Sequence, residues 1–105
     1  MTIALFTARA ALQIDRIYNH IASDNPAAAQ DVVDRIYKVA DFLSTYPNSG
    51  RKTVFKDVRM FAVTPYPYVV FFRYVPKRGQ IRILDVRHSA RRRPALQEHT
   101  MEFRR

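Results

Sequence analysis

Two apolar runs separated by a short polar turn are the strongest pattern in the chain. Residues 68–75, with the sequence YVVFFRYV, are almost continuously apolar, which is typical of a central strand covered on both faces. Residues 76–80, PKRGQ, predict a hairpin turn, and residues 81–86 alternate as a second strand would. The two alternating sets are Ile81, Ile83 and Asp85 on one face and Arg82, Leu84 and Val86 on the other. One face of this strand is therefore expected to be wetter, and the neighbours Phe71 and Phe72 should point to opposite faces of the sheet.

The first half of the chain has helical periodicity in two segments. Thr7 is the expected N-cap of a helix that ends near Ser23, and Asn25 with Pro26 predicts the start of a second helix that runs to about Thr45. Because the link is so short, the two helices should form an antiparallel hairpin. Their predicted apolar stripes are Ala10, Ile14, Ile17, Tyr18 and Ile21, and then Ala29, Val32, Val33, Ile36, Tyr37, Ala40 and Leu43.

Three further segments complete the expected fold. Residues 2–6 predict a short edge strand, residues 58–64 alternate as a strand, and residues 51–55 fit either a loop or a strand. The predicted fold class is α+β: an N-terminal strand, an antiparallel helical hairpin, and a three-stranded antiparallel meander that forms a small twisted sheet. We expect one domain over residues 1–105, with a core over about 2–94 and a tail over 95–105 to which the pattern assigns no structure.

Charge changes this picture more than composition does. The chain has 105 residues and a net charge of +9, but residues 1–50 sum to −1 and residues 51–105 to +10. Arginine, which suits bidentate contacts to carboxylates and phosphates, supplies most of the cations. The second half is therefore expected either to be a solvated basic surface or to meet an anionic partner, a nucleic acid or an acidic protein segment.

Several classes of site have no support in the sequence. The chain has no cysteine, which excludes disulfides and thiolate metal ligands and fits a cytoplasmic protein. Two glycines in the whole chain exclude a glycine-rich phosphate loop. The N-terminus lacks the features of a signal peptide, and no apolar run is long enough to cross a bilayer. We expect no cofactor, no metal site and no membrane association.

The order of these elements, together with five short segments, resembles the RelE/ParE superfamily of toxins from bacterial type II toxin–antitoxin pairs. The segments are the alanine-rich start of the first helix, YPNSGR, DVRMFAV, YVVFFRYV and the closing ILDVRHSARRR. The resemblance extends from residue 2 to about residue 94. It implies a helical hairpin on a small, mostly antiparallel sheet, and a hetero-oligomer in which a cognate antitoxin with an acidic, amphipathic tail wraps and silences the toxin.

The resemblance also implies one of two modes of action. RelE-type members cut messenger RNA on the ribosome, whereas ParE-type members stall DNA gyrase without breaking bonds themselves. RelE-type members use cations on the middle strands, an Arg after the last strand, and a Tyr or His in the tail. Arg91 fits the second of these positions, but Val69 and Val70 occupy the area of the mid-strand Arg, and no Tyr follows Tyr74. The sequence is therefore interpreted as ParE-like, a gyrase poison that acts by binding.

The alternatives remain open at this point. If the protein is a ribosome-dependent endoribonuclease, His88 would move protons and Arg91 would steady the phosphate. A third possibility is a basic domain that binds nucleic acid without poisoning anything. Arg59 and Arg73 could pair with Asp57 and Asp85 along the sheet, and a run of arginines could be only solvated. The residues expected to bind antitoxin or target are Arg59, Arg73, Arg87, His88, Arg91, Arg92 and Arg93.

Overall fold

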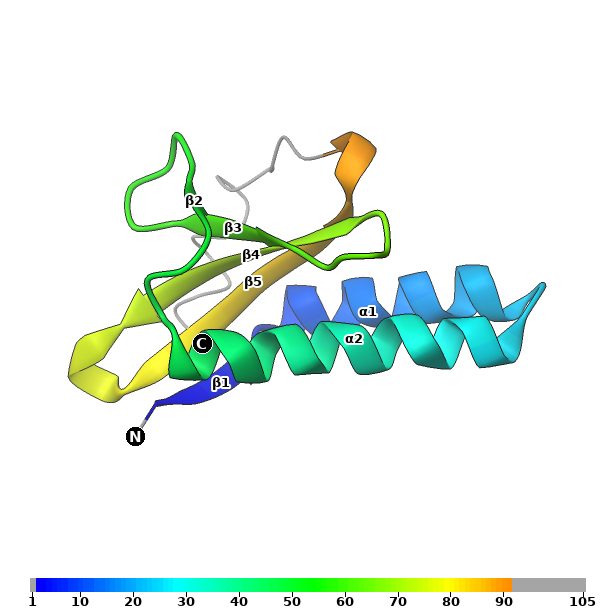
Figure 1. Cartoon of the computed structure of the whole chain (residues 1–105), viewed down its shortest axis with the longest axis horizontal. Coiled ribbons are helices and arrows are strands. Elements are labelled where there is room, and N and C mark those ends of the chain that lie inside the picture. Colours follow the sequence, from blue (N-terminus) through cyan, green and yellow to red (C-terminus); the bar gives the residue numbers. More distant parts are fainter. Residues whose placement is uncertain (1, 92–105) are drawn as a thin grey trace.

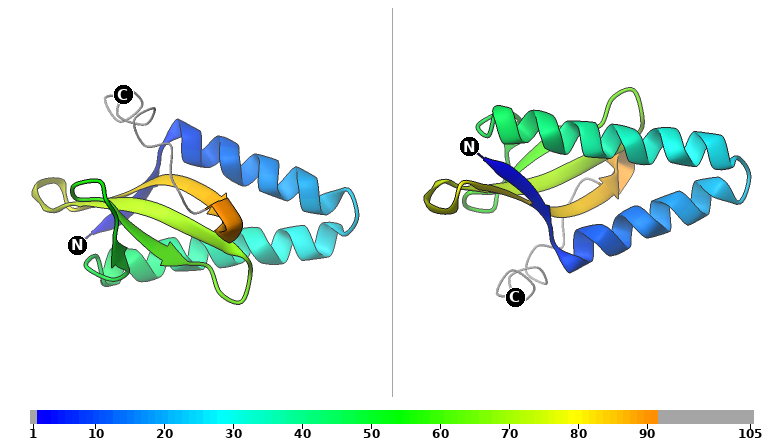
Figure 2. Two further views of the ribbon diagram at one scale, coloured as in Figure 1. Left: turned by 90° about the horizontal axis from the view of Figure 1, so that it is seen from above. Right: turned by 90° about the horizontal axis from the view of Figure 1, so that it is seen from below.

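Two α-helices cover one face of a five-stranded sheet in the computed structural model, which describes residues 2–91 (Figure 1). Seen from above, the sheet lies in front of the helices, and seen from below, the helices lie in front of the sheet (Figure 2). The elements in chain order are β1 (Ile3–Phe6), α1 (Ala8–Ala22), α2 (Pro26–Thr45), β2 (Arg51–Lys52), β3 (Arg59–Ala62), β4 (Tyr68–Val75), the 3-10 turn η1 (Pro76–Arg78), β5 (Gln80–His88) and the 3-10 turn η2 (Ser89–Arg91).

The strand order β1-β5-β4-β3-β2 combines an antiparallel meander with one parallel edge. Strands β3, β4 and β5 are antiparallel neighbours, as the sequence predicts, and β1 runs parallel to β5. Strand β2 has two residues and pairs with β3, where Lys52 lies opposite Arg59 and Arg51 lies opposite Met60. The segment 51–55, which by sequence fits either a loop or a strand, therefore contributes a very short edge strand. The α+β class with a strand, a helical hairpin and a meander is confirmed.

Both helices begin at the predicted caps. The Thr7 hydroxyl accepts the N–H of Ala10 at 3.1 Å, and the Asn25 side chain accepts the N–H of Ala28 at 3.1 Å. Thr7 also donates its hydroxyl to the carbonyl of Leu84 at 3.2 Å, which ties the start of α1 to β5. Because Pro26 fills the first position of α2, where a backbone N–H would have no helical partner, the second helix starts without a conformational cost.

The main core lies between the helices and the sheet. Ala10 and Ile14 of α1 and Val32, Ile36 and Leu43 of α2 are buried against it, with Val39 and Ala40 completing the helical contribution. The predicted stripe of α2 is wrong at two positions: Val39 belongs to it, whereas Tyr37 is 48% exposed and places its ring edge-on to Phe6 at 5.2 Å. The sheet contributes Tyr68, Val70, Phe72, Ile81, Ile83 and Val86.

A smaller apolar cluster lies on the opposite face of the sheet. Val58, Val69, Phe71 and Leu84 form it, with Phe55 and Met60 packed against them. Phe71 and Phe72 therefore do point to opposite faces, as expected for neighbours in a strand.

A β-bulge changes the predicted faces of β5. Phe71 pairs with Asp85 and Phe72 with Ile83, so Leu84 is an extra residue on β5 at this point. Ile83 and Val86, three residues apart, consequently both reach the helix-covered core. The expectation that Asp85 shares a face with Ile81 and Ile83 is wrong, because strict alternation assumes a ladder without an inserted residue. Asp85 is fully buried.

The helices of the described residues 2–91 are too short or too polar to cross a bilayer.

Candidate functional site

The buried carboxylate of Asp85 organises the charged side chains at the C-terminal part of β5. Arg87 donates its Nε–H to Asp85 Oδ2 at 2.7 Å, and the main-chain N–H of Val86 donates to Oδ1 at 2.9 Å. Arg9, in the first turn of α1, has its Nε 3.8 Å from Oδ1. The side chains of Arg9 and Arg87 are only 19% and 20% exposed. The chain's own carboxylate therefore holds in place Arg87, one of the cations predicted to bind a partner.

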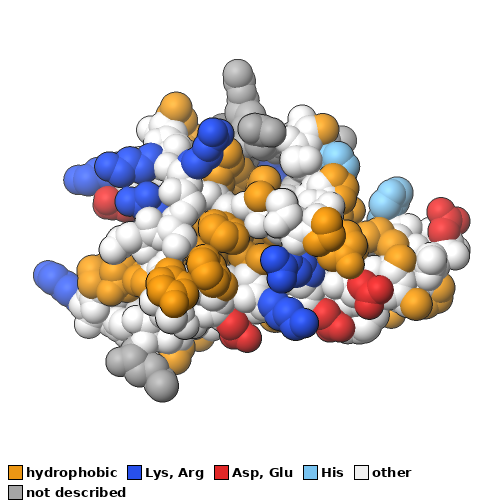
Figure 3. Space-filling model, in the orientation of Figure 1, with side chains coloured by type: hydrophobic (Ala, Val, Ile, Leu, Met, Phe, Trp, Pro, Cys, Tyr) orange, Lys and Arg blue, Asp and Glu red, His pale blue; other side chains and the backbone are white. Residues whose placement is uncertain are grey.

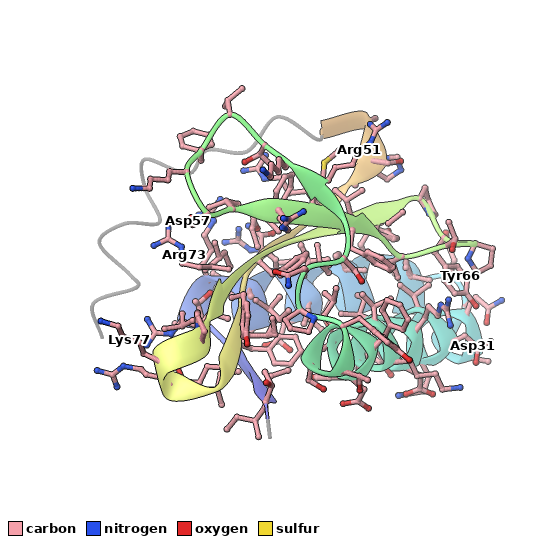
Figure 4. The ribbon with its side chains drawn as sticks, turned by 60° about the vertical axis from the view of Figure 1, so that its left-hand side comes forward. Asp31, Arg51, Asp57, Tyr66, Arg73 and Lys77 are labelled. Atoms are coloured by element: carbon pink, nitrogen blue, oxygen red, sulfur yellow. The ribbon has the colours of Figure 1, made fainter. Side chains whose placement is uncertain are left out.

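Arg59 and Arg73 lie on opposite faces of the sheet. Arg59 pairs with Phe72, so its side chain is on the face that the helices cover, and its Nη1 donates to the carbonyl of Gly50 at 3.3 Å. Arg73 follows Phe72 in β4 and therefore projects from the other face. Figure 4 shows Arg73 on the side of β4 that faces the loop carrying Asp57, away from the helices.

His88 ends β5 beside the start of β4. Its ring packs edge-on against Tyr68, with ring centroids 5.5 Å apart, and its Nδ1 accepts the main-chain N–H of Ala90 at 3.1 Å. Burial raises the pKa of the Tyr68 hydroxyl above its ordinary value, because the phenolate would lose its hydration. Arg91 is the last residue of η2.

The predicted cations do not form one patch. Arg59 contacts Gly50 in the loop between α2 and β2, Arg73 lies on the helix-free face, and Arg87 and His88 are neighbours at the end of β5. The predicted residues Arg92 and Arg93, like the tail 95–105, lie outside the described residues. The hydrophobic pattern within a single strand cannot reveal this separation, because the register between neighbouring strands decides which face of the sheet each cation occupies.

Sequence reasoning missed a row of polar side chains on α1. Arg9, Gln13, Arg16 and His20 recur at steps of four, three and four residues, which is one face of a helix. They line a cleft together with Arg87 and His88 of β5, over a floor of Ile17, Tyr68 and Val86. The spacing is present in the sequence, but the apolar stripe of the same helix is the stronger periodic signal.

An exposed aromatic cluster was also missed. Phe42 and Tyr46 of α2 are 42% and 55% exposed, and the Phe42 ring lies 4.9 Å from that of Tyr46 and 5.4 Å from that of Phe61 in β3. Hydrophobic side chains gather over the C-terminal half of α2 and the sheet above it (Figure 3). We call Phe42, Tyr46 and Phe61 the aromatic surface.

A groove runs along the edge of β3 next to this aromatic surface. Within the described residues β2 pairs only with Arg59 and Met60, so Phe61 and Ala62 have no strand on their outer side. The groove has a volume of about 470 Å³, and its lining includes Arg51, Phe61, Tyr66 and Ser89. An unpaired strand edge beside apolar side chains is suited to binding a protein segment.

No group of three or more His, Asp or Glu side chains that could hold a metal ion occurs in residues 2–91. The arginines of the cleft can bind negatively charged groups, and the rings of the aromatic surface can bind apolar groups.

Comparison with known proteins identifies the family. The model of the ParE toxin of the type II toxin–antitoxin system parDE matches residues 4–93. Toxin RelE2 of Caulobacter vibrioides is 35% identical over 91 residues, which are 87% of this chain and 99% of that protein. A protein of Sinorhizobium fredii described as a toxin, Y4kP, is 35% identical over 89 residues, which are 85% of this chain and 90% of that one.

The fold agrees with this relationship. A chain of the chromosomal ParDE toxin–antitoxin system of P. aeruginosa superposes with a TM-score of 0.72 at 25% identity, covering 84% of this chain and 96% of that chain. The family match includes the first strand, the helical hairpin, the meander and the segment around His88 and Arg91. The protein therefore belongs to the ParE toxins of type II toxin–antitoxin systems, within the RelE/ParE superfamily.

Proposed function

We propose that this toxin poisons DNA gyrase by binding it, and that a cognate acidic antitoxin neutralises the toxin in a cytoplasmic hetero-oligomer. The observation that carries the proposal is the match to the parDE toxin model, which extends to residue 93 and so includes ILDVRHSARRR. That segment is the one whose resemblance to the ParE branch implies gyrase as the target.

The contacts of the cationic side chains favour binding over bond cleavage. General acid–base catalysis needs a base with a lone pair available to the substrate. In His88, Nδ1 already accepts the Ala90 N–H, so a neutral ring carries its proton on Nε2 and offers a donor there. Arg87 is engaged by Asp85. Such an arrangement suits a rigid, positively charged contact surface.

The antitoxin is proposed to occupy the aromatic surface and the groove beside β3. Apolar anchors that fill pockets supply most of the affinity of a protein interface, while charges supply steering and specificity. Phe42 and Tyr46 provide exposed apolar area, and Arg51 lines the neighbouring groove. Acidic residues of the antitoxin would meet Arg51 and Arg59 at this edge, whereas contact with Arg73 requires a second part of the antitoxin on the helix-free face.

A gyrase supercoiling assay with the purified toxin tests the main proposal. We expect loss of supercoiling and accumulation of cleaved DNA at a molar excess over gyrase, and recovery on addition of the antitoxin encoded beside the toxin gene. Induction of the toxin alone should arrest growth, and co-expression of that neighbour should relieve the arrest. No inhibition at a molar excess would contradict gyrase as the target.

Ribosome-dependent RNA cleavage is the second candidate, because one relative is named toxin RelE2 and because His88 and Arg91 are three residues apart at the end of β5 and η2. Toeprinting on translating ribosomes distinguishes the two functions. New cuts that disappear in both His88→Ala and Arg91→Ala would establish the nuclease, whereas unchanged transcripts would leave gyrase as the target.

A further inference from the structure

The cleft between α1 and the end of β5 is lined by three arginines and two histidines. It has a volume of about 630 Å³, within the range of ligand-binding sites. Arg9, Arg16 and Arg87 line it together with His20, His88 and Gln13. The described residues that line the cleft include no Asp or Glu. Asp15, the acidic residue of α1, is not among them. The cleft therefore gathers hydrogen-bond donors and positive charge.

The donors are arranged in a row along α1. Arg9, Gln13, Arg16 and His20 follow one helical face, and the eleven steps along the helix from Arg9 to His20 correspond to a length of about 16 Å. A row of this length extends beyond a single phosphate or carboxylate group. It matches a ligand that repeats its negative charge along a line.

Arg87 of β5 and Arg9 of α1 are positioned before any ligand binds. Asp85, which is fully buried, accepts the Nε–H of Arg87 at 2.7 Å and has the Nε of Arg9 3.8 Å from its other oxygen. A guanidinium that is already oriented loses less side-chain entropy when it binds an oxyanion. The buried carboxylate thus acts as a positioning residue for the cleft.

The apolar residues of the cleft argue against a peptide as its ligand. Val86 is 1% exposed and Tyr68 is 9% exposed, so Ile17, which is half-buried, is the one apolar side chain of the described lining that offers area to a partner. A protein segment would need apolar anchors, and the aromatic surface supplies those with other residues. Arginine and histidine over a closed floor fit a phosphate backbone better.

We propose that this cleft binds the sugar-phosphate backbone of double-stranded DNA, so that the toxin contacts the DNA held by gyrase as well as the enzyme. The inference rests on gyrase being the target, because the gyrase complex supplies the duplex. Arg9, Arg16 and Arg87 neutralise phosphates, and Gln13, His20 and His88 add hydrogen bonds. Contacts of this kind fix position without reading sequence, so binding is independent of base sequence and strongly dependent on salt.

Fluorescence anisotropy of a labelled duplex tests the proposal with the full-length toxin. Arg16→Ala removes an exposed charge from the cleft, and Arg78→Ala removes an exposed arginine from η1, outside the cleft. In 0.1 M salt, Arg16→Ala should weaken binding about fivefold to tenfold and reduce the salt slope by about one unit. Arg78→Ala should leave both unchanged. Gln13→Glu, which adds a negative charge to the same row, should weaken binding at least as much as Arg16→Ala.

Several outcomes would overturn the proposal. Equal losses in Arg16→Ala and Arg78→Ala would mean that only the overall charge attracts DNA. Displacement of the duplex by an equal charge concentration of polyglutamate would point to an acidic peptide instead, and tighter binding of a single-stranded RNA of equal length would point to RNA. Circular dichroism melting curves verify that each variant is folded.

Supercoiling measured on the same proteins separates the two proposals. Gyrase inhibition by a toxin whose DNA binding ignores Arg16 and Gln13 would overturn the cleft assignment and leave the target intact. Cleft-dependent DNA binding without any inhibition of gyrase would instead contradict gyrase as the target.

Discussion

At the scale of single residues, one buried carboxylate decides how two arginines are used. Asp85 reaches the interior because Leu84 is an extra residue in the ladder opposite Phe71 and Phe72. Burial of a carboxylate is costly unless it is paired and hydrogen-bonded, and Arg87, Arg9 and the N–H of Val86 meet that requirement. The stability of the fold and the positions of Arg87 and Arg9 therefore both depend on Asp85.

Asp85→Asn should destabilise the toxin by about 2–4 kcal/mol. The amide oxygen can still accept the N–H of Val86, but Arg87 and Arg9 lose their counter-charge in a mostly buried setting. Urea unfolding measures the change. The matched control is Asp57→Asn, at an exposed loop residue with φ of 62°, a conformation that asparagine also tolerates. A loss of the same size in both variants would contradict the role given to Asp85.

Tyr68 should make stability fall at high pH. Burial raises its pKa in the folded protein above the value of about 10 that it has when unfolded, so above pH 10 the unfolded chain loses the proton first. The contribution of the protonated Tyr68 hydroxyl to the free energy of unfolding is present below pH 10 and is lost as the pH rises through the pKa of the folded state. Urea unfolding at pH 8 and 10.5 should show a larger drop for the wild type than for Tyr68→Phe. Tyr46→Phe, at an exposed tyrosine, should retain the wild-type drop.

At the scale of elements, local sequence signals were reliable wherever backbone chemistry acts alone. Thr7 and Asn25 cap the two helices as predicted, and Gly79, with φ of 59°, closes the hairpin between β4 and β5. Signals that depend on a neighbouring strand were not. The bulge at Leu84 and the pairing of β2 with β3 arise from contacts across the sheet, which no periodicity within one segment encodes.

Gly50→Ala should cost at least about 2 kcal/mol. Gly50 links α2 to β2 with φ of 89°, and a Cβ built there would lie 2.5 Å from the carbonyl oxygen of Met60 in β3. The backbone strain of alanine at this φ and the steric clash of its Cβ with Met60 therefore both lower the stability of the variant. Gly79→Ala, which meets only the left-handed φ, should cost about 1 kcal/mol. Equal melting temperatures for the two variants would contradict this difference.

At the scale of the whole molecule, apolar and cationic surfaces are separate. The aromatic surface of Phe42, Tyr46 and Phe61 shares no residue with the cleft lined by Arg16 and Arg87. A protein partner and a polyanion could therefore be bound by different parts of one small toxin. Exposed apolar area of this kind also predicts self-association when the antitoxin is absent.

Replacing Phe42 and Tyr46 together by serine should reduce that self-association. Sedimentation velocity of the wild type should show a mean mass that rises with concentration, while the double variant stays nearer the monomer mass of 12.3 kDa. Leu12→Ser, at a 49% exposed position on α1 outside the aromatic surface, is the control and should behave as the wild type does. A monodisperse wild type at high concentration would refute the expectation.

The sequence by itself determined the two helices, the strands other than β2, the order of these elements and the family. Caps, turns and hydrophobic periodicity act over a few neighbouring residues, and each motif, such as YPNSGR or ILDVRHSARRR, is one continuous stretch. Only the tertiary structure decided where the charges lie. Register places Arg59 and Arg73 on opposite faces, and the bulge buries Asp85 beneath Arg87. Packing of α1 beside β5 then joins Arg16 to Arg87 in one cleft, although seventy residues separate them in the chain.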